Sequence, residues 1–133
     1  MLWNFGSSDL STKGRLLYLP RGSGSAMFDI YNITTNRWKI GQYIQGMGEA
    51  LTTGTMYTYD GKDRIYYQVT TTGRLFYYDI VKNQINPFGT IPYGMSTAII
   101  GNRLEIVTTD DNLSYLYVMR HTGQEMWRTL IMY

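Results

Sequence analysis

The chain has 133 residues, of which 44% are apolar and 17% are charged, and its formal net charge is +2. This composition indicates one globular domain and excludes an intrinsically disordered chain. The Lys and Arg residues are scattered along the sequence, so we expect no nucleic-acid partner. Cysteine is absent, which excludes disulfides and thiolate metal sites.

The N-terminal segment and the hydropathy pattern bear on localisation. Residues 1–9 contain neither the basic stretch nor the apolar stretch of a secretory signal peptide. No apolar run approaches the roughly 20 residues that a membrane-spanning helix needs. We therefore expect a soluble protein with no membrane partner.

Aromatic and β-branched residues dominate the chain and favour β-strands. Thirteen Tyr, four Phe and three Trp are surrounded by Ile, Thr and Val, the residue types that are enriched in strands. No stretch shows a convincing helical period, and the nearest, residues 42–51, is interrupted by Gly46 and Gly48. The sequence therefore predicts an all-β fold.

In chain order, turn signals divide the sequence into three antiparallel units of four strands each. The first unit, residues 1–46, is predicted to hold one strand between residues 2 and 10 and others at 16–19, 26–31 and 37–40. The second unit, residues 47–94, is predicted to hold strands at 53–59, 64–69, 75–80 and 85–91. The third unit, residues 95–133, is predicted to hold strands at 96–100, 103–108, 114–119 and 126–131.

Two local signals refine the second unit. Asp60-Gly61 lies between its first two predicted strands and is a strong hairpin signal. Pro87 and Pro92 mark its last strand as irregular or on the edge of a sheet, because proline cannot donate a backbone hydrogen bond.

One pattern recurs in all three units. A strand ends near an aspartate, and an aromatic residue follows nine positions later; the third copy has valine in place of the aspartate. The pairs are Asp29 with Trp38, Asp79 with Phe88, and Val118 with Trp127. An upstream strand in each unit opens with arginine, at Arg15, Arg64 and Arg103. Such repetition predicts one domain, residues 1–133, built from three similar units.

This pattern resembles the kelch-type blade of a β-propeller, a four-stranded unit of about 40 to 50 residues. The aromatic-Asp pairs Phe28-Asp29 and Tyr78-Asp79 and the following Trp38 match that family's third and fourth strands. The paired glycines that usually end the second kelch strand are missing here, so kelch-like is the appropriate description. The resemblance covers nearly the whole chain and implies three blades.

The resemblance also implies roles for the repeated residues. A blade cannot bury both of its faces alone, so aromatic residues at repeated positions are expected to pack between neighbouring blades. These packing residues are Phe28, Trp38, Tyr78, Phe88, Tyr117 and Trp127. The repeated arginines Arg15, Arg64 and Arg103 are candidate rim contacts, which either face an acidic partner or pair with an acid of a neighbouring blade.

Three blades are fewer than the roughly four to eight of a closed propeller, so the ring is expected to be incomplete within one chain. Several copies could complete one ring, or another protein could cover an open arc, because uncovered blade faces expose apolar patches. The sequence therefore predicts a non-catalytic structural or docking component of a homo-oligomer or hetero-assembly. By analogy of composition and fold, the expected setting is a phage virion, in its tail, neck or nozzle.

Two other functions stay open. Tyrosines on an open blade face suit sugar contacts, so the second interpretation is a carbohydrate-binding module with a glycan partner. An enzyme is the third and is disfavoured, because the copper enzymes of the galactose oxidase type that share this propeller need Cys and His ligands. His121 is interpreted as a turn residue, and Asp29 and Asp79 as strand-end acceptors of turn N–H groups. No catalytic, metal or cofactor-binding residue is predicted, and no cofactor is expected.

Overall fold

The computed structural model describes residues 16–20, 27–43, 56–69, 73–91, 103–120 and 125–133. These residues form β-strands and no helix, which confirms the prediction of an all-β chain. The strands are β1 (Leu16–Pro20), β2 (Met27–Asn32), β3 (Arg37–Tyr43), β4 (Met56–Tyr59), β5 (Arg64–Val69), β6 (Arg74–Asp79), β7 (Gln84–Thr90), β8 (Arg103–Thr108), β9 (Ser114–Arg120) and β10 (Glu125–Ile131).

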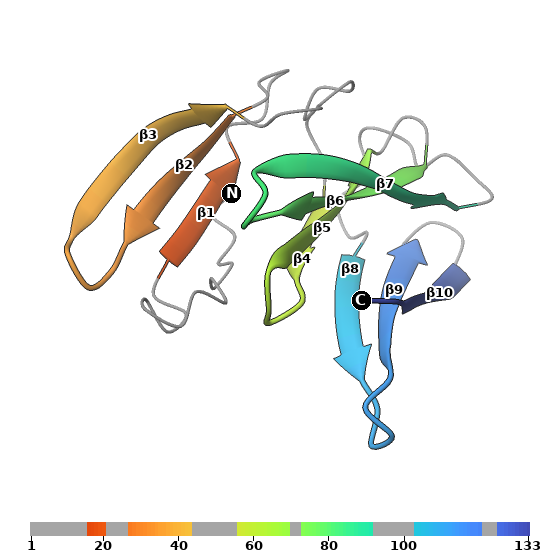
Figure 1. The fold of residues 1–133 in the computed structure, drawn as a ribbon. Coiled ribbons are helices and arrows are strands. Elements are labelled where there is room, and N and C mark those ends of the chain that lie inside the picture. Colours follow the sequence, from red (N-terminus) through yellow and green to blue (C-terminus); the bar gives the residue numbers. More distant parts are fainter. Residues whose placement is uncertain (1–15, 21–26, 44–55, 70–72, 92–102, 121–124) are drawn as a thin grey trace.

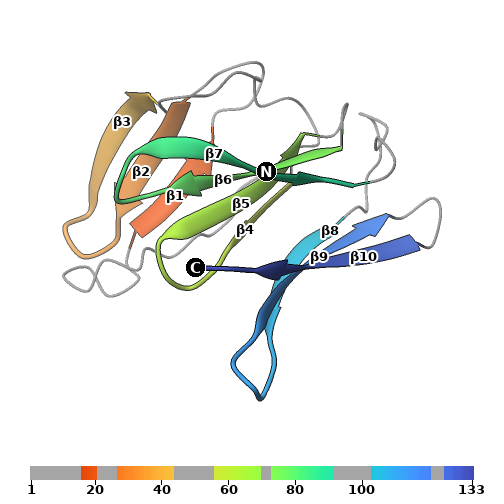
Figure 2. The same cartoon turned by 45° about the vertical axis from the view of Figure 1, so that its right-hand side comes forward.

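The described strands form three antiparallel sheets, each made of strands that follow one another in the chain. The first sheet has the order β1-β2-β3, the middle sheet β4-β5-β6-β7 and the third sheet β8-β9-β10. The three sheets lie side by side in chain order in two views of the molecule (Figures 1 and 2). The strands predicted at 2–10 and 96–100, and the predicted unit boundaries near residues 46 and 94, lie outside the described residues.

The predicted turn between the first two strands of the second unit is confirmed. The Oδ1 atom of Asp60 accepts hydrogen bonds from the backbone N–H of Lys62, at 2.9 Å, and of Arg64, at 3.0 Å. Gly61 adopts a φ of 77°, a conformation that glycine reaches without a steric penalty. These contacts end β4 and begin β5 where the sequence indicates.

Pro87 lies inside β7, which is an edge strand of the middle sheet. Pro87 pairs with Phe76, next to a shift in the register between Leu75 and Phe76. This confirms the prediction that proline marks an irregular or edge strand, because the edge position does not require a second ladder of hydrogen bonds.

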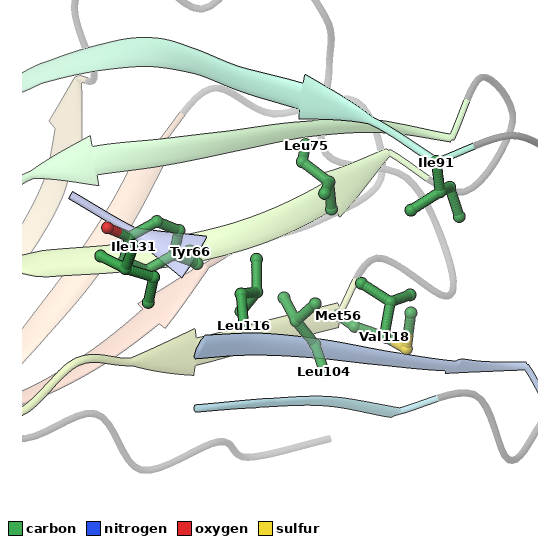
Figure 3. Close-up of a cluster of buried hydrophobic side chains, with 8 residues drawn as sticks. All are labelled: Met56, Tyr66, Leu75, Ile91, Leu104, Leu116, Val118 and Ile131. Atoms are coloured by element: carbon green, nitrogen blue, oxygen red, sulfur yellow. The ribbon is translucent and has the colours of Figure 1, made fainter. Parts of the chain in front are cut away.

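The middle sheet is buried on both faces. On one face Ile65 and Tyr67 of β5 pack with Tyr18 of the first sheet. On the other face Tyr66 packs with Leu116 of the third sheet. Figure 3 shows the second cluster, in which side chains from both sheets meet in the space between them: Met56, Tyr66, Leu75, Ile91, Leu104, Leu116, Val118 and Ile131. Because burial of one such side chain contributes about 1.5–3 kcal/mol, the two clusters account for how the sheets are held together.

Candidate functional site

Each sheet contains one row of three side chains that pair across its strands in the same way. The rows are Leu17–Tyr31–Trp38 in the first sheet, Ile65–Tyr78–Ile85 in the middle sheet and Leu104–Val118–Trp127 in the third sheet. We refer to them as the Trp38 row, the Ile85 row and the Trp127 row. Because side chains directly opposite each other lie on one face of a sheet, each row belongs to a single face.

Two of the rows pack against the sheet that precedes them in the chain. The Ile85 row belongs to the cluster that contains Tyr18 of the first sheet. The Trp127 row packs against the cluster that contains Tyr66 of the middle sheet. The contact between the first and middle sheets is therefore repeated, with the same row positions, between the middle and third sheets.

The Trp38 row lies on the outward face of the first sheet, opposite to the face that packs on the middle sheet. Leu16 and Ile30, which alternate with this row, pack towards the middle sheet. The Trp38 side chain is 54% exposed, and its ring lies 4.9 Å from the ring of Tyr31, between centroids. The neighbouring Ile40 is also exposed. Trp38 and Ile40 are thus open to solvent on a face of the kind that is packed twice elsewhere in the chain, whereas Leu17 and Tyr31 of this face are half-buried.

The third sheet also has an outward face, on the side away from the middle sheet. It alternates with the buried Leu104, Leu116 and Val118. We call it the Tyr117 face; its residues are Arg103, Glu105, Val107, Tyr115, Tyr117, Met119, Met126, Arg128 and Leu130. The guanidinium of Arg128 lies over the ring of Tyr115, 5.0 Å from its centroid. Leu130 is 41% exposed, so this face combines apolar side chains with charged ones.

The hydrogen-bond registers correct the repeat positions that the nine-residue spacing predicts. Asn32, not Asp29, is the structural equivalent of Asp79: their Oδ1 atoms accept the backbone N–H three residues on, from Thr35 at 3.0 Å and Lys82 at 2.9 Å. Asp79 also forms a salt bridge with Lys82 at 3.5 Å.

Asp29 has a different role from the one that the spacing predicts. Its Oδ1 atom accepts a hydrogen bond of 2.7 Å from the backbone N–H of Gly41, which has a φ of 63°. This contact lies where the register between β2 and β3 shifts, between Phe28 and Ile30. The carboxylate therefore satisfies an N–H group of a β-bulge, which lies across the strand pair from Asp29 and not in the turn that follows it.

The predicted packing residues occupy three kinds of place. Tyr78, Phe88 and Trp127 lie between sheets, and Phe88 of the middle sheet and Trp127 of the third sheet pack against the same cluster and line one small cavity. Trp38 and Tyr117 lie on the two outward faces. The side chain of Phe28 lies outside the described part of the chain. The structure thus brings Phe88 and Trp127 together and leaves Trp38 and Tyr117 at opposite ends of the stack of sheets.

The three candidate rim arginines have different surroundings. Arg15 lies outside the described residues, and Arg103 is exposed. Arg64 donates a hydrogen bond of 2.9 Å to the backbone carbonyl of Met132 and lies 4.7 Å from the ring centroid of Tyr77. Its guanidinium therefore contacts the segment that follows β10.

That segment packs on the β4–β5 hairpin, a contact that the sequence pattern did not indicate. Tyr133 lies under the Nζ atom of Lys62, which is 3.6 Å from its ring centroid, and near the guanidinium of Arg64. Burial raises the pKa of Tyr133, and the nearby Asp60 raises it further. No periodic signal marks a two-residue segment, so only the fold reveals this contact between the middle and third sheets.

A shallow cleft of about 440 Å³ lies between the first and middle sheets. Its lining includes two cations, Arg37 and Lys39, two amides, Asn32 and Asn83, and the aromatic residues Tyr18 and Tyr78. The hydroxyl of Tyr78 donates a hydrogen bond of 2.8 Å to Asn83 at this site. The cleft therefore presents amide, cationic and aromatic groups to solvent.

The described residues offer no metal site and no membrane span. Among them, no group of three His, Cys, Asp or Glu side chains is placed to hold a metal ion, and no helix is long and apolar enough to cross a membrane. His121 lies outside this part of the chain. No protein-family profile, no curated protein and no solved structure matches the chain.

Proposed function

We propose that this protein is a non-catalytic structural or docking subunit whose two outward faces are covered by protein in a larger assembly. One observation carries the proposal: the Ile85 and Trp127 rows are packed against a neighbouring sheet, whereas Trp38 of the equivalent row is 54% exposed. An exposed tryptophan beside exposed aliphatic side chains is typical of a surface that another molecule covers.

A phage virion, in its tail, neck or nozzle, is the setting that we propose for this assembly, with the sheets as blades of a kelch-like β-propeller. Support comes from the order of three small antiparallel sheets stacked in chain order and from the cysteine-free, tyrosine-rich composition. Mass spectrometry of purified particles tests this setting. The expected result is recovery of the chain in a fixed ratio to other particle proteins, and its absence from particles would exclude the virion setting.

The assembly itself is tested by the native size of the chain in a concentrated extract of the cells that make it naturally. Sedimentation at a size well above one chain, with Trp38 protected from oxidative surface labelling, is expected. A folded chain that sediments as a single copy in that extract would contradict the proposed function.

A carbohydrate-binding module is the second candidate. The cleft between the first and middle sheets favours it, because amide side chains together with the tyrosines Tyr18 and Tyr78 are groups that bind sugar hydroxyls and sugar faces. A glycan array probed with the wild type and with Asn32→Ala tests it. Binding that the substitution abolishes would support this function, and an array without signal would remove it.

A further inference from the structure

We propose that the Tyr117 face of one copy of this chain packs against the Trp38 row of a second copy. The two copies then associate head to tail, as neighbouring sheets do within the chain. This inference rests on the proposed function and specifies the partner that covers both outward faces.

The repeated packing within the chain defines the contact. The Ile85 row and the Trp127 row each pack on the sheet that precedes them in the chain. The face of the preceding sheet that they contact is the one opposite to that sheet's own row. In the middle sheet this alternate face carries Tyr66 and Tyr77, which pack towards the Trp127 row. By the strand register, Glu105 and Tyr117 are their equivalents in the third sheet. The Tyr117 face is thus the kind of surface on which such a row packs twice already.

The chemistry of the two surfaces is complementary. The Trp38 row offers one aliphatic and two aromatic side chains, Leu17, Tyr31 and Trp38, and the Tyr117 face offers Tyr117, Val107 and Leu130. The Tyr117 face carries Arg103 and Arg128 against the single acid Glu105, so its charge is positive. The outward face of the first sheet carries the carboxylate of Asp29. Opposite charges on largely apolar surfaces favour this orientation of the two copies.

A contact between two different faces has a consequence that a symmetric contact lacks. A bound pair keeps one unused face of each kind, so association continues until a ring closes or a filament forms. A chain with one damaged face can still use the other face. Two chains that are damaged on different faces can therefore form one pair and no more.

The test uses one variant for each face. Trp38→Glu places a charge in the Trp38 row, and Leu130→Glu places one on the Tyr117 face; Val81→Glu is the matched control, because Val81 is 79% exposed in the β6–β7 turn, away from both faces. Sedimentation velocity of each purified chain is measured alone and in equimolar mixtures. Circular dichroism verifies the fold, and Ile40→Lys with Met126→Lys replaces the first pair if either chain unfolds.

The wild type and Val81→Glu are expected to associate, whereas each face variant is expected to bind its own kind roughly 100-fold more weakly. The equimolar mixture of the two face variants is expected to form pairs of one copy of each. A monomeric wild type, a mixture without pairs, or association that only one of the two variants disrupts would overturn the proposal. The proposed function would survive these results if the chain is still found in a large particle in the natural extract, with another protein as its partner.

Discussion

Trp38 and Trp127 occupy the same row position in their sheets, yet only Trp127 is packed against a neighbouring sheet. Trp127 pairs with Val118, and Trp38 pairs with Tyr31. Trp127 contacts the cluster between the middle and third sheets, whereas Trp38 is 54% exposed. The two tryptophans therefore differ in their tertiary surroundings rather than in the row position that they occupy.

The first prediction compares these two side chains. Trp127→Ala is expected to lower the free energy of unfolding by about 2–4 kcal/mol, because it removes a partly buried aromatic side chain from a packed cluster. Trp38→Ala is expected to change it by less than about 1 kcal/mol in the monomer. Urea unfolding at a concentration where the chain is monomeric measures both. Equal losses would mean that Trp38 is already packed within a single chain.

The second prediction concerns Asn83 and Asn36, the last residues of two equivalent turns. Both have a positive φ, 53° and 52°, and both accept a hydrogen bond from a tyrosine hydroxyl five residues earlier. Tyr78, the donor to Asn83, is buried, whereas the bond from Tyr31 to Asn36 is exposed. Asn83→Ala is therefore expected to cost about 2–3 kcal/mol and Asn36→Ala about 1 kcal/mol.

Glycine separates the two contributions at Asn83. Asn83→Gly keeps the positive φ accessible and removes only the side-chain acceptor, so it should cost less than Asn83→Ala. Thermal unfolding of the three variants under identical conditions gives this order. If Asn83→Gly proved as destabilising as Asn83→Ala, backbone strain would have no part in the effect.

The third prediction is a loss of stability at alkaline pH. Burial raises the pKa of Tyr66 and of Tyr78 to about 12, from an ordinary value of 10.0. Between these pH values the unfolded chain releases protons that the folded chain retains, so stability falls as the pH rises from 10 towards 12. The slope is expected to approach about 1.4 kcal/mol per pH unit for each tyrosine.

Tyr66→Phe provides the control for this pH dependence. Denaturation midpoints between pH 8 and pH 11 should fall less steeply in this variant, because one of the two shifted hydroxyls is gone. A midpoint that does not change above pH 10 in the wild type would show that these hydroxyls ionise normally in the folded protein.

The fourth prediction concerns Gln68, which is fully buried in the middle sheet. Within the described part of the chain, its Oε1 and Nε2 atoms have no hydrogen-bond partner. A buried amide without partners costs about 1–3 kcal/mol, so Gln68→Met, which removes the polar atoms and keeps the length, should leave stability equal or higher. A clear loss in urea unfolding would indicate that the amide is satisfied. Val107, its equivalent in the third sheet by strand register, is apolar.

Alternation and turn chemistry were sufficient to predict the ten strands that the structure describes. The predicted ranges 64–69 and 103–108 agree with β5 and β8. They agree because a polar turn adjoins each strand, before β5 and after β8. Which residues occupy equivalent positions in the three sheets was not predictable in the same way. In the first sheet, the bulge at Gly41 shifts the register between β2 and β3. In the third sheet, the β9–β10 hairpin has one more residue pair next to its turn, Arg120 with Glu125, than the β6–β7 hairpin, whose last pair is Asp79 with Gln84. A fixed spacing in sequence cannot reveal either change.

The outward faces show a second limit of the sequence. Trp38 lies nine residues after Asp29, and Trp127 lies nine residues after Val118. A sequence pattern that predicts packing for one tryptophan therefore predicts it for the other. Whether a neighbouring sheet is present depends on the position of the unit in the stack, which is a property of the whole fold. The sequence therefore identified residues suited to packing but could not distinguish covered ones from exposed ones.

The environment of Trp38 across a dilution series tests most directly whether the outward faces of this protein are covered by other copies. In a Trp3→Phe and Trp127→Phe background, Trp38 is the only tryptophan and reports on its own surface. The expected emission shifts to shorter wavelength, with weaker acrylamide quenching, as the concentration rises and the Trp38 row becomes covered. Emission and quenching typical of an exposed tryptophan at every concentration would contradict this coverage.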